Sequence, residues 1–578
     1  MADAPRADDA PVATDGAGEL PRGREAADRL AWAEAYESLS RAHQAAPLPA
    51  EDAELLATAA YLTGQVAGCL RALQQASEAH AAAGNLPRAA RFLFWLGFTL
   101  FTQGDMAQAS GWLARAARLL DEVQGEYAEH GLLLLPRIFQ TAVEGDHASS
   151  ETAATQMAEI GHRTGDVEVL SFALHQQGRA MIRQGRVREG MALLDESMVA
   201  VVAGELAPYL AGNLYCSMID ACREIAEIRR AHEWTVALTT WCDQQPDMFT
   251  FSGQCLVHRA EIMQLRGQWD EAVEEAKRAC DRFAHATDQY AVGMAWFRLG
   301  ELYRVRGAST QAEDAYRMAS ERGRDPQPGL ALLWLDEGKA GAARAAIDRA
   351  VAEATDRLQR AALLPARVEI ALAAGDVQAA TVASEELSAI AAEFGTPVLR
   401  ADADRARGAV GLAAGDARDA LVALRAAWQV WRGVEAQHEA AKVRVLIGRA
   451  CRALGDEESA MLELDSARRV FAQLGATPEL ARLEALDRPT PEPAAARGLT
   501  ARELQVLRLL AAGKTNHAIA VDLVLADKTV DRHVSNIFTK LGVNTRAAAT
   551  AYAYENRLVQ RESTAHPPLH EPHEGRPR

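Results

Sequence analysis

The residues from 528 to 541 combine an apolar stripe with a face of hydrogen-bonding side chains. At 100° per residue, the apolar stripe of this predicted helix consists of Val530, Val534, Ile537 and Leu541. The opposite face consists of Lys528, Arg532, Ser535 and Thr539. Such a face can form hydrogen bonds with base edges in the major groove of DNA. An ordinary amphipathic helix with a solvated face has the same pattern, so this helix alone leaves both interpretations open.

The surrounding sequence predicts three more short helices that would hold this one in place. A capping box of Thr500 and Glu503 begins the first, and Thr515 can cap the second. After a tight turn at 525–527 and the helix at 528–541, a fourth helix runs from Thr545 to about residue 557. The predicted inward positions of the first two helices are Leu504, Val506, Leu507, Leu509, Leu510, Ile519, Ala520 and Leu523.

A dense pattern of individual residues distinguishes this segment from an ordinary helical bundle. It consists of Leu499, Thr500, Arg502, Glu503, Gly513, Asn516, Ile519, Ala520, Thr529, Val530, His533, Asn536, Ile537, Lys540, Leu541, Gly542, Val543 and Arg546. With these residues the segment closely resembles the LuxR-type DNA-binding domain, a helix-turn-helix module. The resemblance covers about a tenth of the chain.

The resemblance implies a role for each helix and for individual side chains. The helix at 528–541 would be the recognition helix, and the fourth helix would form much of the contact in a homodimer on DNA. The implied base-contacting residues are Asp531, Arg532 and Ser535. The expected contacts to the DNA backbone are Lys514, Thr515, Lys528, Thr529, His533, Lys540, Thr545 and Arg546. Helix capping alone would explain Thr515, and packing explains His533 equally well.

Two positions depart from the family pattern. Ala526 stands where the family usually has a capping serine, so we expect Asp527 to cap the recognition helix. Asp531 replaces the commoner lysine, which predicts weaker attraction to phosphate and a preference for the amino group of cytosine.

Charge is divided unevenly along the chain. The net charge of the whole chain is −17, whereas residues 499–560 contain eight Lys or Arg and five Asp or Glu. The remainder carries 54 basic and 74 acidic residues. This distribution favours a basic DNA-binding module attached to an acidic body that does not itself approach phosphate.

Helical repeats fill most of the chain. The segment around 296–319 has the spacing of a tetratricopeptide repeat, with small residues at Gly300, Ala312 and Ala319 where two helices must approach closely. Turns recur at positions 64, 104, 145, 185, 226, 267, 307, 338, 375, 415 and 455, with Leu30 as a candidate first turn. Most steps are 40 or 41 residues, so the helices should be longer than in the usual repeat of about 34 residues.

The predicted fold is all-α: a tetratricopeptide-like α-solenoid of about 11–12 helix pairs, followed by the four-helix domain. The array would span 21–486, with an irregular joint near 321–330 that divides it into two halves, because Pro326 and Pro328 break a helix. A Pro-rich linker is predicted at 487–498 and the DNA-binding domain at 499–560. Disordered tails are predicted at 1–20 and 561–578.

No enzymatic site is predicted. The chain lacks the phosphate-binding pattern Gly-x₄-Gly-Lys-Ser/Thr, and no catalytic set of side chains stands out from the background of charged residues. The seven cysteines form no Cys-x-x-Cys pair. We therefore expect no cofactor, no metal and no catalytic residue.

The leading hypothesis is a cytoplasmic transcription regulator, associated with the nucleoid when bound to DNA. Its repeat array would sense a protein, a peptide or a small effector, and RNA polymerase is a further candidate partner. No membrane segment or signal peptide is predicted. The alternative is a protein-interaction scaffold in which the array is the main functional part. An enzyme with unrecognised chemistry in the array is a third, weaker reading.

Overall fold

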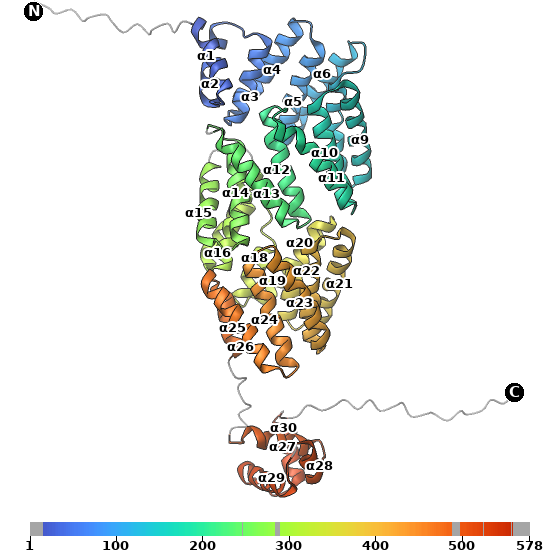
Figure 1. Cartoon of the computed structure of the whole chain (residues 1–578), viewed down its shortest axis with the longest axis vertical. Coiled ribbons are helices and arrows are strands. Elements are labelled where there is room, and N and C mark those ends of the chain that lie inside the picture. Colours follow the sequence, from blue (N-terminus) through green and yellow to red (C-terminus); the bar gives the residue numbers. More distant parts are fainter. Residues whose placement is uncertain are drawn as a thin grey trace, which may run out of the picture. The chain divides into compact units, whose positions relative to one another are not determined.

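The computed structural model describes residues 16–245, 247–283, 289–487, 498–523, 525–556 and 558. The chain divides into two compact units, Met1–Leu483 and Glu484–Arg578. The predicted tail at 561–578 and most of the predicted linker lie outside the described residues. Every element in the described part is a helix, as predicted (Figure 1). No described helix combines the length and hydropathy needed to cross a membrane.

The helices of the first unit and its C-terminal extension are α1 (Gly16–Asp28), α2 (Trp32–Ala45), α3 (Ala50–Leu62), α4 (Val66–Ala82), α5 (Leu86–Thr102), α6 (Met106–Asp121), α7 (Ala128–Leu132), α8 (Leu135–Val143), α9 (His147–Thr164), α10 (Val167–Arg183), α11 (Val187–Ala203), α12 (Pro208–Glu224), α13 (Ile228–Asp243), α14 (Ser252–Leu265), α15 (Trp269–Arg282), α16 (Gln289–Val305), α17 (Ser309–Glu321), α18 (Gly329–Asp336), α19 (Ala340–Glu353), α20 (Arg357–Ala373), α21 (Val377–Phe394), α22 (Pro397–Ala414), α23 (Ala417–Gly433), α24 (Gln437–Ala453), α25 (Glu457–Leu474) and α26 (Thr477–Asp487). The second unit contains α27 (Ala501–Ala511), α28 (Asn516–Asp522), α29 (Asp527–Leu541) and α30 (Arg546–Glu555).

The first helix begins earlier than the sequence predicts. Residues 1–15 of the predicted N-terminal tail lie outside the described part, but α1 starts at Gly16, so the prediction of disorder was wrong for residues 16–20. The carboxylate of Glu19 pairs with Arg41 at 3.0 Å, and Leu20 packs against the core of the first helices. These contacts with the next helices hold the first turn of α1 in place.

Antiparallel helix pairs follow one another through the first unit, which forms a tetratricopeptide-like α-solenoid. All eleven predicted turns have positive φ, including the non-glycine turn at Ala226, and so does Leu30. The predicted close approach of small residues is clearest between α10 and α11. A Cβ on Gly178 would lie 2.6 Å from the carbonyl oxygen of Gly190. The repeat therefore places glycine both where the backbone reverses and where two helices touch.

The irregular joint lies between α17 and α18, at residues 322–328. Helix α18 has only eight residues, which explains the short step between the turns at Gly307 and Gly338. The joint does not divide the array into two halves, however, and that expectation was wrong. One hydrophobic core contains residues between 26 and 255 together with residues between 331 and 406, so packing continues across the joint.

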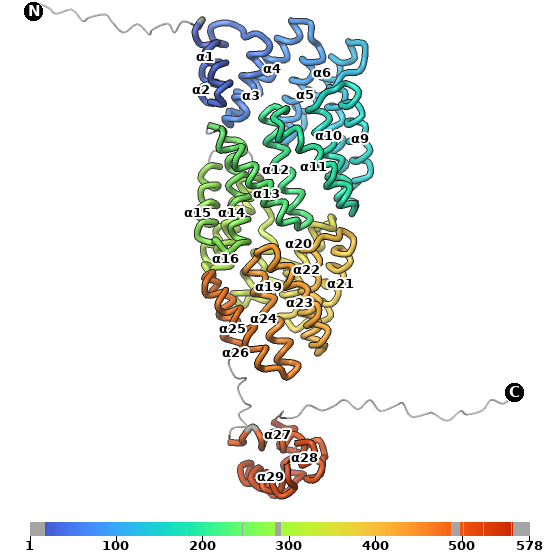
Figure 2. The backbone as a smooth tube through the Cα atoms, in the orientation of Figure 1, coloured from blue at the N-terminus to red at the C-terminus, as the bar shows by residue number. Residues whose placement is uncertain are grey.

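Successive coils of the solenoid touch one another, which explains why the joint does not separate them (Figure 2). The hydroxyl of Thr396 donates to the carbonyl oxygen of Ile225 at 2.7 Å, and Thr477 donates in the same way to Arg306 at 2.8 Å. Both acceptors lie 171 residues earlier in the chain. In each case the turn of one repeat supports the start of a helix in the next coil.

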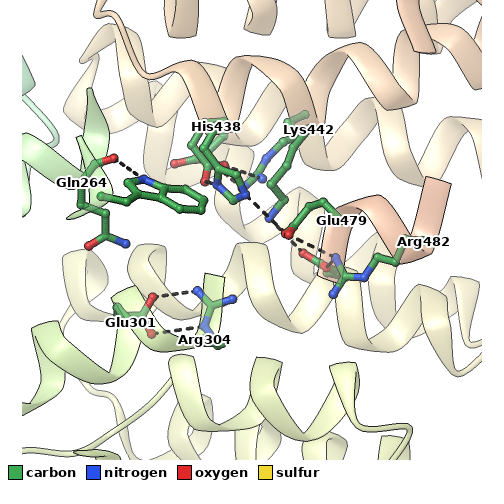
Figure 3. A network of polar contacts seen from close by, with 12 residues as sticks. Gln264, Glu301, Arg304, His438, Lys442, Glu479 and Arg482 are labelled. Carbon is green, nitrogen blue, oxygen red and sulfur yellow. Dashed lines mark hydrogen bonds and ion pairs between the residues drawn. The ribbon is translucent and has the colours of Figure 1, made fainter. Parts of the chain in front are cut away.

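A network of partly buried charges joins α18, α20, α24 and α26, and Figure 3 shows two of its members, Lys442 and Arg482. Arg482 binds Asp336, and it also binds Glu369 at 3.2 Å. Lys442 lies 3.5 Å from the same Glu369 carboxylate. Burial raises the pKa of Glu369, but the two cations outweigh it and bring the pKa down to about 2. This part of the array is therefore held by paired charges as well as by apolar packing.

Candidate nucleic-acid interface

The apolar sides of the four C-terminal helices form one core. Val530 and Ile537 of α29 are fully buried, Val534 is 9% exposed, and Leu541 is half-buried. They pack with Val506, Leu507 and Leu510 of α27 and with Ile519 and Ala520 of α28. The predicted apolar stripe of 528–541 is thus confirmed, and its burial fixes which side of α29 faces outward.

Short polar side chains begin three of the four helices. The hydroxyl of Thr500 accepts from the amide of Glu503 at 3.2 Å, and the Glu503 carboxylate accepts from the amide of Thr500 at 2.7 Å. This is the predicted capping box. Thr515 and Thr545 cap α28 and α30 by accepting from Ala518 and Ala548.

The start of α29 differs from the prediction. Ala526 is the N-cap residue, no side chain caps the helix, and Asp527 is already its first helical residue. The expectation that Asp527 acts as the cap was therefore wrong. The Asp527 carboxylate instead lies 3.0 Å from Nδ1 of His517 on α28, because the extended backbone of Ala526 brings Asp527 into the first turn.

The outward face of α29 carries all three predicted base-contacting residues. Asp531, Arg532 and Ser535 are exposed, as are Lys528 and Thr529 in the first turn, whereas His533 is half-buried. Among the described residues, neither Lys528 nor Arg532 has a carboxylate partner. The Ser535 hydroxyl donates to the carbonyl oxygen of Asp531 at 2.9 Å, which leaves its lone pairs to accept a hydrogen bond.

Asp531 belongs to a polar chain that ties the beginnings of three helices together. The Asn516 side-chain amide donates to the Asp531 carboxylate at 2.7 Å, and its oxygen accepts from Arg546 at 2.8 Å. Arg546 also donates to the carbonyl oxygen of Lys514. The structure thus brings Lys514, Asp531 and Arg546 together, and the side chain of each already binds a neighbouring group.

Two of the predicted backbone-contacting lysines form ion pairs within the domain. Lys514 binds Asp522 at 2.6 Å at an exposed position. Lys540 lies in the last turn of α29 and binds Glu503 at 2.6 Å. The side chain of Glu503 is only 4% exposed. Burial raises its pKa, but the hydrogen bonds from Lys540 and Thr500 outweigh this effect and keep the pKa below its ordinary value.

Asn516 belongs to the residue pattern of the LuxR-type domain, but the sequence did not reveal that its side chain positions its neighbours. Its position immediately after the Thr515 cap was the available signal. An amide at the start of a helix can donate to one neighbour and accept from another. Its partners Asp531 and Arg546 are 15 and 30 residues away, however, so only the folded arrangement identifies them.

Comparison with known proteins assigns this unit to a family. Residues 497–553 match the family model described as bacterial regulatory proteins, luxR family. The chain is 49% identical over 61 residues to the transcriptional regulatory protein LiaR of Bacillus subtilis, and 45% identical over 62 residues to the response regulator protein VraR of Staphylococcus aureus. Each match covers 11% of this chain and 29–30% of the relative. The chain thus spans less than a third of the length of these relatives.

Two solved structures resemble the helical repeats. The APC/C hetero-tetramer Cut9–Hcn1 aligns with a TM-score of 0.40 and 13% identity, over 94% of this chain and 96% of that one. A Rap protein complexed with competence and sporulation factor aligns with a TM-score of 0.39 and 11% identity, over 69% of this chain and 99% of that one. These values are too low to indicate what this chain binds.

Proposed function

Because the C-terminal unit is a LuxR-type helix-turn-helix domain, we propose that this chain is a DNA-binding transcription regulator. The observation that carries the proposal is the exposed face of α29 within that domain. It presents Arg532 and Lys528 without a carboxylate partner among the described residues, opposite a buried apolar stripe. A helix of this kind docks in the major groove with its outward side chains at the base edges.

Within this proposal, the side chains divide between bases and phosphates. Arg532 contacts a guanine, and Asp531 and Ser535 lie beside it on the same face. Other side chains have polar groups near the outside of the domain, where they can reach the DNA backbone. These proposed backbone contacts are Lys528, Thr529, His533, Thr515 and Thr545. Lys514, Lys540 and Arg546 act mainly by holding the domain together, since each already binds a neighbour.

We propose a homodimer on DNA, with α30 providing much of the contact between the two modules. Ala547 and Ala551 are exposed and lie four residues apart on α30. Side chains at this spacing lie on one face, and small ones let two helices approach closely.

The repeat array is the proposed sensing part of a cytoplasmic regulator, with RNA polymerase as a further proposed partner.

The proposal is tested with the full chain on genomic DNA fragments. Selection of bound fragments from a library of this genomic DNA should yield a defined sequence. On that sequence Arg532→Ala should cost about 1–3 kcal/mol, or about 5- to 150-fold in Kd. Arg418→Ala is the matched control, because Arg418 is an exposed arginine of the array and should have no effect.

Salt dependence separates the two roles of Arg532. If Arg532 contacts a base, the loss of affinity is confined to the selected sequence. A loss that is the same on every sequence, with a salt slope reduced by about one, assigns Arg532 to a phosphate instead. If the wild-type chain shows no sequence preference and Arg532→Ala changes nothing, the protein is not a regulator of this kind.

A further inference from the structure

A cavity of about 530 Å³ lies where the first coil of the repeat array meets the next one. Helices α3, α4, α5 and α12 and the segment 249–254 contribute its lining. Its volume falls within the roughly 300–1,000 Å³ of pockets that hold small organic molecules. Buried lining residues such as Leu73 and Phe92 form its apolar part, whereas Thr102, Gln103 and Asn213 are exposed at its rim.

The segment 249–251 closes one side of the cavity. The amide of Phe249 donates to the carbonyl oxygen of Leu62 at 2.7 Å, and the amide of Thr250 donates to the same oxygen at 3.1 Å. These bonds attach the entrance of α14 to the turn after α3. The cavity therefore exists only because one coil of the array is docked on another.

Aromatic rings provide much of the wall. The rings of Trp95 and Tyr209 lie edge to face with centroids 5.3 Å apart, and Phe251 lies 6.1 Å from Tyr61. Ring faces and edges fixed in this way favour a flat, apolar guest.

Among the residues that the structure describes, the lining contains no Asp, Glu, Lys, Arg or His. Burial raises the pKa of the Cys69 thiol to about 12, so it stays neutral at physiological pH. Burial also raises the pKa of Tyr209. A charged guest would lose its hydration without meeting a counter-ion here. The polar groups of the lining are hydroxyls and amides, including those of Thr99, Asn213 and Gln254.

We propose that this cavity binds an uncharged, planar and largely apolar small molecule with a polar, uncharged end that faces the rim. A peptide fits less well, because each of its buried backbone amides would need a hydrogen-bond partner. Binding of this molecule is the signal that the array senses. That last role rests on the proposed function, whereas occupation of the cavity does not.

The test uses prodan, an uncharged naphthalene ketone whose emission shifts to shorter wavelength in an apolar site. The full chain should bind one prodan per molecule with this shift. Asn213→Trp, which places an indole across the rim, should weaken binding about tenfold or more, equivalent to about 1.4 kcal/mol. Gln103→Trp, at another exposed position of the rim, is a second blocking variant. Gln108→Trp, exposed on α6 and outside the lining, is the control and should bind like the wild type.

A charged relative of the probe tests the chemical class. Anilinonaphthalenesulfonate has a similar size and a permanent negative charge, and it should bind about tenfold or more weakly than prodan. Equal binding of the sulfonate would show that the cavity does not select uncharged molecules. If prodan does not bind, or binds equally to the wild type and both blocking variants, the cavity is not a ligand site.

The same variants separate this inference from the proposed function. DNA binding is measured both without and with prodan, and the proposed DNA contacts all lie in the second unit. If Asn213→Trp and Gln103→Trp lose prodan but prodan never changes the affinity of the wild type for DNA, the cavity binds a ligand without being the sensor. If the chain binds prodan but no DNA, the regulator proposal fails and the ligand site remains.

Discussion

Replacing Lys540 by alanine should destabilise the C-terminal unit, because this lysine neutralises a buried carboxylate. Its ammonium group lies 2.6 Å from Oε2 of Glu503. The Glu503 side chain is 4% exposed and that of Lys540 is 37% exposed. Without the lysine, Glu503 keeps the amide of Thr500 at 2.7 Å as its hydrogen-bond donor. The variant therefore leaves a buried negative charge without a counter-ion.

The expected loss of stability follows from the exposed fractions of the Glu503 and Lys540 side chains. Removing one partner of a fully buried ion pair costs about 3–5 kcal/mol. Exposed pairs contribute about 0–1 kcal/mol, because water screens the attraction. Since one partner is buried and the other is partly exposed, we expect Lys540→Ala to lower the free energy of unfolding of the second unit by about 1–3 kcal/mol.

Hydrogen exchange of the full chain measures this loss in the unit concerned. The most protected amides of α27 and α29 should exchange about 5- to 150-fold faster in Lys540→Ala. Peptides from the repeat array are unchanged in the same sample. Lys528→Ala is the matched control, because Lys528 lies on the same helix without a carboxylate partner among the described residues.

The opposite outcome would show that Lys540 contacts DNA instead of stabilising the domain. If α27 and α29 exchange as in the wild type while DNA affinity falls on all sequences with a salt slope reduced by about one, Lys540 is a phosphate contact. In that case the ion pair of Lys540 with Glu503 contributes nothing to the stability of the second unit.

Three further predictions concern the repeat array, whose unfolding is followed by fluorescence because all ten tryptophans lie in it. Gly178→Ala should lower the free energy of unfolding by about 1–3 kcal/mol, because the added Cβ meets the Gly190 oxygen at 2.6 Å; an unchanged urea midpoint would contradict the close approach. Burial raises the pKa of Asp402 to about 6. The folded state then binds the proton more tightly than the unfolded state, so stability should fall as pH rises from about 4 to 7. Asp402→Asn should flatten that slope and stabilise the array at pH 7 by about 1–3 kcal/mol; a slope equal to that of the wild type would assign it to other groups. Thr396→Val removes the hydrogen bond to the carbonyl oxygen of Ile225 between two coils and should cost about 1–3 kcal/mol, whereas an unchanged midpoint would show that this contact contributes nothing.

The turns and helices of the array were predictable because they depend on local chemistry. A backbone reversal with positive φ favours glycine, so regularly spaced glycines mark the turns, and even Ala226 was found from the period alone. The start of α1 was not predictable in this way. Its first turn depends on Arg41 and on the core of the next helices, whereas its own sequence resembles a polar tail.

The sequence predicted which face of the candidate interface is exposed. It did not predict which side chains on that face are already bound to other residues. Helical periodicity determines which side of α29 is exposed, so Arg532 and Ser535 were placed correctly on the outward face. Periodicity does not show which polar groups are already bound. Lys540 and Arg546 have the residue type of phosphate contacts, yet each binds a group in another helix, 37 and 30 residues away. Pairing across such distances depends on tertiary packing and has no local signal.

Contacts between successive coils are the hardest to predict from the sequence, because their partners lie farthest apart in the chain. The same contacts determine where the cavity forms. The partners of Thr396 and Thr477 lie 171 residues earlier, a separation that follows from the curvature summed over several repeats. A small change in the angle between neighbouring helix pairs would move these contacts apart. The cavity between the first two coils depends on the same docking, since Phe249 closes it by binding the backbone of Leu62. A ligand that fills the cavity contacts both coils at once and stabilises their docking by the free energy of its own binding. In the sensing role that we propose for the array, binding of a small molecule would therefore change the stability of the array, which is the first requirement of a sensor.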